Sequence, residues 1–504
     1  MTFQAETTSD AEGSTTADSA GSVGRSAGRG LRWALLGAVL LKMGSFALSL
    51  AMVRLLAPHD FGLYAVALAA NAFLIHVNDM GIIAGVVQWR GEPARMLPTA
   101  RTMAIVFSLS WYALFWFGAP VVAGIAGSPE AIPLMRLLAL IIVVDGVTAV
   151  SVGLIQRRFQ QDKLTKAIAV GFSFSACITL TLAANGAGAY SFVLGSLAQS
   201  LVVAALVLRI ARVPFRLGLD RQVARRLIVF GAPLALGLGI ESVLLYSDSM
   251  IVGNVLGTYT LGFYLLAFNI ASWVPGLVST AVRYVSIPAF SRLAEHEMDT
   301  VAGGAQRTIP LLIGFVMPIA AGMVALAPSM IHVLYGERWL PSAEALRFLA
   351  FVMVARMLTA LVFDIQTGLG NTPATTVLNL VWLVVLVPAL WVGANLWGMR
   401  GAAMSNAVVA LLVAIPLAFA MLHRAGVDMR PVLRRSVRPV LSGIAAGLTM
   451  ALVASRLDLP AADLLVAGSL GVLVYLGLAV PAGARAVARD WVAVRLANRR
   501  QVKA

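Results

Sequence analysis

The sequence is poor in cysteine and histidine and carries no familiar catalytic or cofactor motif. Its 504 residues include one cysteine, Cys177, inside an apolar run, and five histidines scattered over different segments. A disulfide framework needs paired cysteines, and a zinc site needs Cys or His at short regular spacings, so neither is expected. No phosphate-cradling glycine loop followed by Lys and Ser or Thr occurs, and no nucleophile elbow occurs. We therefore expect neither a metal nor a cofactor.

Charge is also scarce. Charged residues make up 12% of the chain, whereas soluble globular proteins have roughly a quarter. The chain is 60% hydrophobic with a mean hydropathy of +0.87, which indicates an integral membrane protein. The net charge of +15 does not predict a nucleic-acid partner, because the basic residues lie in short gaps between apolar runs and form no continuous face. Those gaps are also too short for the sizeable catalytic loop of a membrane polymerase or glycosyltransferase, so we expect no enzyme.

Long apolar runs dominate what is present. A transmembrane helix needs about 20 apolar residues. That criterion predicts an all-α polytopic membrane protein with 14 transmembrane helices. They are expected at 32–54, 63–88, 101–126, 131–156, 165–185, 188–210, 228–253, 261–287, 308–334, 344–366, 374–396, 400–423, 437–455 and 462–484.

The basic residues predict the orientation of these helices. Alternate gaps on one side hold 30 of the 38 Lys and Arg residues, and the opposite side or its rim holds six. Because basic residues are retained on the cytoplasmic side, both termini are expected in the cytoplasm of a bacterial cell, with the chain in its cytoplasmic membrane. Residues 1–24 lack the apolar core of a signal peptide, so we expect a disordered cytoplasmic tail.

Two pairs of stretches suggest an internal duplication. Residues 54–67, RLLAPHDFGLYAVA, return without a gap as residues 254–267, NVLGTYTLGFYLLA, and residues 186–191 and 398–403 form a second pair at a similar offset. Six helices per copy, an even number, would give two parallel lobes related by a pseudo-two-fold axis along the membrane normal. The last two predicted helices fall outside the duplication. Short Gly- and Leu-rich strings also match by chance in membrane proteins, which is the alternative.

The predicted domain organisation follows from the duplication. The basic stretch at 212–227 mixes five arginines with apolar residues, so it either lies on the anionic inner leaflet or is solvated. The apolar stripe of the C-terminal tail favours an interfacial helix. The expected parts are a tail at 1–30, an N-lobe of helices 1 to 6 at 31–212, a linker at 213–227, a C-lobe of helices 7 to 12 at 228–424, helices 13 and 14 at 425–484, and a basic cytoplasmic tail at 485–504.

Several ionisable residues lie within the predicted helices. An ionised side chain near the bilayer centre costs about 2.5 to 3.5 kcal/mol on insertion scales, so these residues should not face lipid. We interpret them as the lining of an aqueous cavity between the lobes; the alternative is that they form private ion pairs inside each lobe. The candidates are Lys42, Asn78, Asp79, Asp145, Glu241, Asp248, Arg356 and Asp364, with Arg283 and Trp273 as further candidate substrate contacts.

Two predicted helices contain residues that favour bending. Pro233, Gly237 and Gly239 fall in the first half of the seventh helix, and Pro275 in WVPG is expected to interrupt the eighth. Proline removes a backbone hydrogen bond and glycine adds conformational freedom, so these positions are candidate hinges. Gly and Pro in membrane helices also serve as packing residues, and that alternative stays open.

Longer stretches around the repeat resemble a known family. Residues 54–69, residues 247–293 with Asp248, Gly262, Tyr264 and Pro275, and the YGERWLPSA stretch at 335–343 are similar to bacterial polysaccharide-unit flippases of the Wzx or exporter type. These proteins belong to the multidrug/oligosaccharidyl-lipid/polysaccharide (MOP) superfamily, which also holds multidrug extruders and lipid II flippases. The resemblance covers residues 30–485, and fourteen helices fit the polysaccharide and lipid II branches better than the twelve-helix drug extruders.

The resemblance implies a function and a substrate. The expected function is to flip undecaprenyl-diphosphate-linked oligosaccharide units across the membrane for lipopolysaccharide or exopolysaccharide production, with H⁺ or Na⁺ as possible coupling ions and polymerase or export machinery as possible partners. In this interpretation Lys42 and Arg356 attract the diphosphate, and Glu241, with Asp79 and Asp248, releases it or binds the coupling proton. The alternatives are an ion-coupled multidrug antiporter, a lipid II flippase and a scaffold that transports nothing.

Overall fold

Every regular element that the structure describes is helical. The computed structural model describes residues 37, 39–78, 81–89, 93–294, 298–369, 371–457 and 459–479. Within them, ten helical segments are long and apolar enough to cross a membrane. This confirms an all-helical polytopic membrane protein, as expected where the bilayer offers no partner for unpaired backbone groups. Asp79 and the predicted tails at 1–30 and 485–504 lie outside the described residues.

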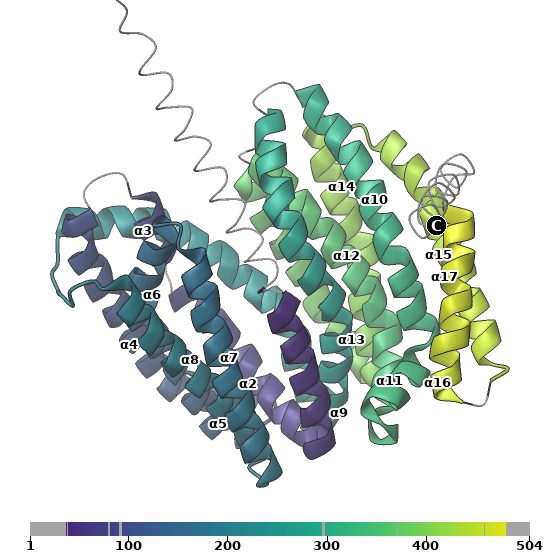
Figure 1. The fold of residues 1–504 in the computed structure, drawn as a ribbon, viewed down its shortest axis with the longest axis horizontal. Helices are drawn as coiled ribbons and strands as arrows, with labels where there is room; N and C mark the ends of the chain where they lie inside the picture. Colours follow the sequence, from purple (N-terminus) through teal and green to yellow (C-terminus); the bar gives the residue numbers. More distant parts are fainter. Residues whose placement is uncertain are drawn as a thin grey trace, which may run out of the picture. The chain divides into compact units, whose positions relative to one another are not determined.

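The chain divides into two compact units, Met1–Tyr246 and Ser247–Ala504. In the first unit, α7 packs along α8, and α6 contacts α3, α4 and α8 (Figure 1). A helix at 39–55 precedes the labelled elements of this unit. These are α2 (Pro58–Asn78), α3 (Ile82–Gln88), α4 (Pro93–Ile125), η1 (Pro129–Ala131), α5 (Ile132–Leu138), α6 (Leu140–Arg157), α7 (Gln161–Ala184) and α8 (Tyr190–Ala211).

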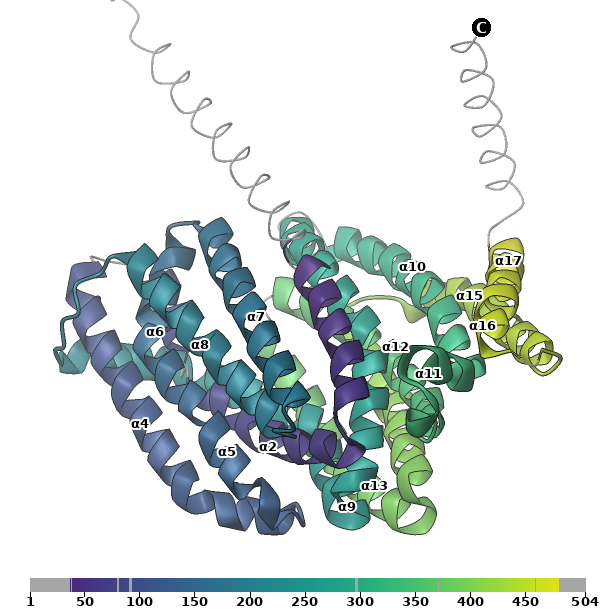
Figure 2. The ribbon, with the colours of Figure 1, turned by 60° about the horizontal axis from the view of Figure 1, so that its bottom comes forward.

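In the second unit, α12 packs against α10 and α13, while α15 packs on α10 and α17 on α15 (Figure 2). Helix α9 (Arg221–Ala294) continues from the first unit into the second. The other elements are α10 (Met298–Ala325), α11 (Ala327–Tyr335), η2 (Glu337–Trp339), α12 (Ser342–Gly368), α13 (Thr372–Val409), η3 (Ala410–Ala414), α14 (Ile415–Arg424), α15 (Met429–Ala454), α16 (Pro460–Ala462), η4 (Asp463–Ala467) and α17 (Gly468–Ala479).

Helix breaks recur at equivalent places in the two copies. The helix at 39–55 ends just before Ala57, and α9 breaks at Gly257, its counterpart at the offset of 200, where φ is 80°. Gly186, with φ 79°, begins the turn before α8, and Gly398, with φ 60°, breaks α13 at the paired position. Since each stretch that repeats in sequence also carries the same local break, the structure supports the internal similarity at both places.

Two helices begin earlier than predicted because an aspartate caps each of them. Helix α9 begins at Arg221 instead of 228, where Asp220 Oδ1 accepts hydrogen bonds from the backbone N–H groups of Gln222 and Val223. Helix α15 begins at Met429 instead of 437, where Asp428 accepts from the N–H of Arg430. A carboxylate that accepts hydrogen bonds from the free N–H groups of a first helical turn stabilises the start of the helix. The basic residues that were expected in the loops before these two helices therefore lie in the first turns of α9 and α15.

Three expectations about continuity were wrong. The predicted interruption at 273–276 is absent, because α9 stays helical there and breaks at Gly257. The predicted helix 308–334 is two helices, α10 and α11, separated at Leu326, whose φ and ψ are −106° and 15°. The predicted helix 63–88 is likewise divided, since Gly81, with φ 65°, precedes α3. Hydropathy alone cannot predict where a helix breaks. A proline can lie inside a continuous helix, and a helix break can lie within an apolar run.

Candidate functional site

A buried polar cluster surrounds Asp248 in the second unit. The Asp248 side chain is 2% exposed. Its Oδ1 accepts hydrogen bonds from the Ser249 N–H at 2.7 Å and the Ser249 hydroxyl at 3.4 Å. Its Oδ2 accepts from the Tyr264 hydroxyl at 3.2 Å and from Asn406 Nδ2 at 3.4 Å. We call Asp248, Ser249, Tyr264 and Asn406 the Asp248 cluster.

The helix breaks allow the Asp248 cluster to form. Asp248 precedes the break of α9 at Gly257 and Tyr264 follows it, while Asn406 follows the break of α13 at Gly398. In a straight helix, residues 16 apart would be separated by about 24 Å, so Asp248 and Tyr264 could not bond without the turn at Gly257. The repeated sequence stretch therefore supplies both the turn and the tyrosine.

Arg356 lies near the Asp248 cluster. It is a half-buried residue of α12, and its guanidinium carbon is 4.9 Å from the centre of the Phe268 ring. Arg356 also attracts the Asp248 carboxylate electrostatically. Asp364, eight residues further along α12, is 2% exposed. Of the predicted site residues, the structure thus brings a carboxylate and a cation together, within one unit.

The first unit has a polar face on α2 and α6. Asn71 and Asn78, both buried, donate from Nδ2 to the backbone carbonyls of Met135 and Ile142, each at 3.2 Å. Asp145 on α6 is half-buried. The side chain of Tyr64 stacks on Phe192, with ring centres 4.6 Å apart. The polar groups of this face hold α2 against α5 and α6.

Asp145 and Arg356 occupy equivalent positions in a further repeat. Residues 136–149 and 347–360 align at an offset of 211, with Arg, Leu, Ala, Val, Thr and Ala at six shared positions. Both copies contain the same local hydrogen bond, in which a threonine hydroxyl donates to the backbone carbonyl three residues earlier. Thr148 donates to Asp145 and Thr359 donates to Arg356, each at 3.1 Å. The two copies therefore carry opposite charges at one position.

The remaining predicted residues are not members of the Asp248 cluster. Lys42 and Glu241 are exposed, whereas Ser242, the sequence counterpart of Lys42, is 3% exposed. The boundary between the units falls between Glu241 and Asp248, although both lie on α9. Gly237, Gly239, Trp273 and Pro275 lie in helical parts of α9, the last two half-buried, and the side chain of Arg283 lies outside the described part of the chain.

The sequence reasoning missed Asn406 and gave Tyr264 no role. Tyr264 could have been chosen, because it is the repeated tyrosine and lies near a predicted charged helix. Asn406 gives no local signal, since an amide within an apolar run is common. Its Oδ1 is buried and has no hydrogen-bond partner in the described part of the chain. An unpaired carbonyl oxygen beside a carboxylate could accept a proton donor or a hard cation.

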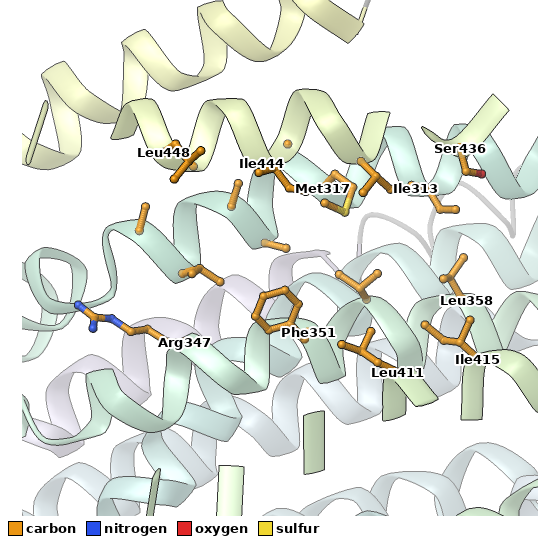
Figure 3. A pocket seen from close by; sticks show the side chains of 18 of the residues that line it. Ile313, Met317, Arg347, Phe351, Leu358, Leu411, Ile415, Ser436, Ile444 and Leu448 are labelled. Carbon is orange, nitrogen blue, oxygen red and sulfur yellow. The ribbon is translucent and has the colours of Figure 1, made fainter. Parts of the chain in front are cut away.

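An apolar groove runs along the second unit between α10, α12, α14 and α15. Its cavity volume is about 760 Å³. Figure 3 shows Arg347 at one end and Ser436 at the other, with apolar side chains between them. The lining includes Ile313, Met317, Phe351, Leu358, Leu411 and Leu448. A long apolar groove with polar groups only at its ends fits the chain of a lipid.

The first part of the predicted linker is held against α4 within the first unit. Residues 212–220 are not helical, and Arg101 donates from Nη1 to the Pro214 carbonyl at 2.6 Å while its guanidinium lies 4.9 Å from the Phe215 ring centre. Thr102 and Thr99 accept hydrogen bonds from the N–H groups of residues 218 and 220. Contacts with α4 therefore hold the backbone of residues 214–220 in place.

We expect Arg101→Met to release this segment. Loss of a charge-assisted hydrogen bond should raise the open population about tenfold. Limited trypsin digestion of the full-length protein should then cleave at Arg212 or Arg216 about ten times faster than in the wild type. Arg95→Met, an exposed residue on the same helix, is the control. Equal cleavage rates in both variants would show that Arg101 does not hold the linker.

A family profile described as "Polysaccharide biosynthesis protein" matches residues 51–344. The succinoglycan biosynthesis transport protein ExoT of Rhizobium meliloti (strain 1021) is 28% identical over 62% of this chain and 64% of its own length. The lipopolysaccharide biosynthesis protein WzxC of Escherichia coli (strain K12) is 21% identical over 81% of this chain and 82% of its own. The chain thus spans less than two thirds of the first relative and most of the second.

Two solved structures show the same fold. The lipid II flippase MurJ in an inward closed conformation aligns with a TM-score of 0.70 at 14% identity, over 91% of this chain and 99% of that one. An inward-facing multidrug resistance MATE family transporter of the MOP superfamily aligns with a TM-score of 0.60 at 14% identity, over 78% of this chain and 98% of that one. At this identity the likeness concerns the fold alone.

Proposed function

The chain belongs to the polysaccharide biosynthesis protein family, as a membrane transporter of the MOP superfamily, and from this premise we propose that it flips undecaprenyl-diphosphate-linked oligosaccharide units across the bacterial cytoplasmic membrane. The observation that carries the proposal is the apolar groove of about 760 Å³ in the second unit. A polyprenyl chain is long and apolar, and the groove offers it apolar contact along several helical turns.

The proposed topology has fourteen membrane helices with both termini in the cytoplasm. Two of the ten apolar segments contain a break, at Gly257 and at 397–398, so each supplies two helices. The helices at 39–55 and α2 complete the fourteen. Six helices in each of two lobes, related by a pseudo-two-fold axis, would move against each other as the substrate crosses.

In the proposed mechanism, cations bind the diphosphate and carboxylates control its release. Arg356 and Lys42 attract the diphosphate, with Asn78, Asp79, Asp145, Trp273 and Arg283 as further substrate contacts. The Arg356 guanidinium binds the diphosphate or the Asp248 carboxylate in turn, because a guanidinium can bind either anion. Asp248 thereby competes with the diphosphate for Arg356. Glu241 and Asp364 are the other proposed coupling groups, and Gly237, Gly239 and Pro275 are the proposed hinge positions as the lobes move.

A coupling cation has a candidate place in the Asp248 cluster. The carboxylate of Asp248 and the unpaired Oδ1 of Asn406 are oxygen ligands that H⁺ or Na⁺ would use. The same cluster favours the alternative function, an ion-coupled multidrug antiporter, since such a transporter needs a buried carboxylate that exchanges a cation. Polysaccharide polymerase or export machinery is the proposed partner.

Deleting the gene should make a lipid-linked oligosaccharide accumulate on the cytoplasmic side. We expect wild-type protein to restore export and an Ala321→Phe variant, which fills the groove, to reduce it at least tenfold at equal membrane abundance. Ala389→Phe on the separate surface lined by 385–409 is the control. Dye efflux that depends on the protein, with no accumulated glycan in the deletion strain, would favour the antiporter instead.

A further inference from the structure

The groove of the second unit contains one charged residue. Among the residues that line it, Arg347 is charged and Ser436 is polar, and all others are apolar or glycine. The Ser436 hydroxyl donates to the Val432 carbonyl of its own helix at 2.7 Å, so it is already satisfied. Figure 3 shows the guanidinium of Arg347 at the end of the groove beyond Phe351. The groove is therefore amphiphilic: a cation at one end and an apolar surface along its length.

Arg347 is not used by the protein itself. It is exposed and makes no hydrogen bond or ion pair with the residues that the structure describes. Its counterpart in the first unit, Arg136, is engaged: Nε donates to the Trp116 carbonyl at 3.1 Å, and the guanidinium carbon lies 4.7 Å from the Trp116 ring centre. The same repeated arginine thus packs in one unit, whereas in the other its donors are free for a ligand.

The dimensions fit one extended lipid chain. At 1.5 Å per residue, α12 spans about 16 Å from Arg347 to Leu358, and α15 spans about 27 Å from Leu433 to Ala451. The hydrocarbon core of a bilayer is about 30 Å thick. A chain lying in the groove would cross at least half of this core, and its head would then reach Arg347. The charge count puts this end of α12 on the outer side.

We propose that Arg347 and the groove form a holding site for the lipid carrier after translocation, in which the guanidinium binds the carrier's diphosphate and the groove binds its polyprenyl chain. The proposal rests on the proposed function for the identity of the lipid. A planar guanidinium binds phosphate oxygens through two parallel hydrogen bonds, which suits a diphosphate.

Native mass spectrometry of the full-length protein, titrated with undecaprenyl diphosphate, undecaprenol and phosphatidylglycerol, tests the site. We expect Arg347→Gln to weaken undecaprenyl diphosphate binding about tenfold and to leave undecaprenol unchanged, because undecaprenol has no phosphate. Arg338→Gln, an exposed arginine of the neighbouring turn that does not line the groove, should stay within twofold of wild type. Ala451→Phe, at the Arg347 end, should weaken both polyprenyl lipids.

Three results would overturn the proposal. Equal diphosphate affinity in the wild type and Arg347→Gln, with groove-dependent polyprenyl binding intact, would remove Arg347 and leave the proposed function standing. Phosphatidylglycerol binding that is as tight and as dependent on Arg347 would assign the site to a bilayer lipid. No binding of either polyprenyl lipid to the wild type would contradict the substrate class in the proposed function as well. For Arg347→Gln and Arg338→Gln, undecaprenol binding also reports whether the variant has kept its fold.

Discussion

Replacing Arg356 with glutamine is expected to abolish glycan export and to leave the amount of protein in the membrane within twofold of wild type. Export should be lost because the variant no longer presents a cation to the diphosphate beside Asp248. Abundance should be kept because Asp248 retains hydrogen bonds from Ser249, Tyr264 and Asn406, so the buried carboxylate is not left unpaired. Quantitative blotting of membranes and measurement of surface polysaccharide test both parts.

Arg400→Gln is the matched control for this variant. Arg400 also lies over an aromatic ring of the second unit, with its guanidinium carbon 6.0 Å from the Phe348 ring centre, but it is exposed and is not a member of the Asp248 cluster. Export by this variant should stay near wild type. If Arg356 and Asp248 are instead only a structural pair, Arg356→Gln should lower abundance, and the double variant Asp248→Asn/Arg356→Gln should restore both abundance and export.

Replacing Gly401 with alanine is expected to lower both the abundance of the folded protein and its thermal unfolding temperature. Gly401 and Gly393 face each other across the break of α13, and a Cβ on Gly401 would lie 2.0 Å from the Gly393 carbonyl oxygen. A backbone atom cannot move aside as a flexible side chain can, so the two helices would have to separate. Overpacking of this kind costs about 1 to 3 kcal/mol or more, a large part of the stability of most domains.

Gly477→Ala is the control for the Gly401 variant. Gly477 lies in α17, and nothing lies within 4 Å of the position that its Cβ would take. We expect its thermal unfolding temperature in detergent to equal or slightly exceed that of the wild type, since alanine favours a helix by about 1 kcal/mol. A Gly401→Ala protein as abundant and as heat-stable as the control would show that the two helices can separate without loss.

The apolar segments could be predicted from the sequence, because a membrane-spanning helix must be apolar over its whole length and satisfies its own backbone. Most helices therefore lie where hydropathy puts them. The ends of α9 and α15 were missed because capping by Asp220 and Asp428 extends each helix into a basic stretch. The division between α10 and α11 has no hydropathy signal, since the residues around Leu326 are as apolar as the helices themselves.

The candidate site was predictable in part. Asp248 and Arg356 could be selected one by one, since an ionisable residue in an apolar segment is costly and needs a partner. The turn at residues 54–67 and 254–267 could be predicted from its repetition. A repeat of isolated identities, as between residues 136–149 and 347–360, is harder to see, because six scattered matches in apolar stretches resemble chance.

By itself the sequence determined the class of protein, the segments that lie in the membrane, the repeated turn and the family resemblance, because each of these depends on local composition or order. Only the tertiary structure decided which partners these residues meet. Asn406 reaches Asp248 across 158 positions of sequence, and Arg347 lines a groove together with residues of α10 and α15. Such contacts depend on how rigid helices pack after they have formed, and packing involves residues that no local pattern connects.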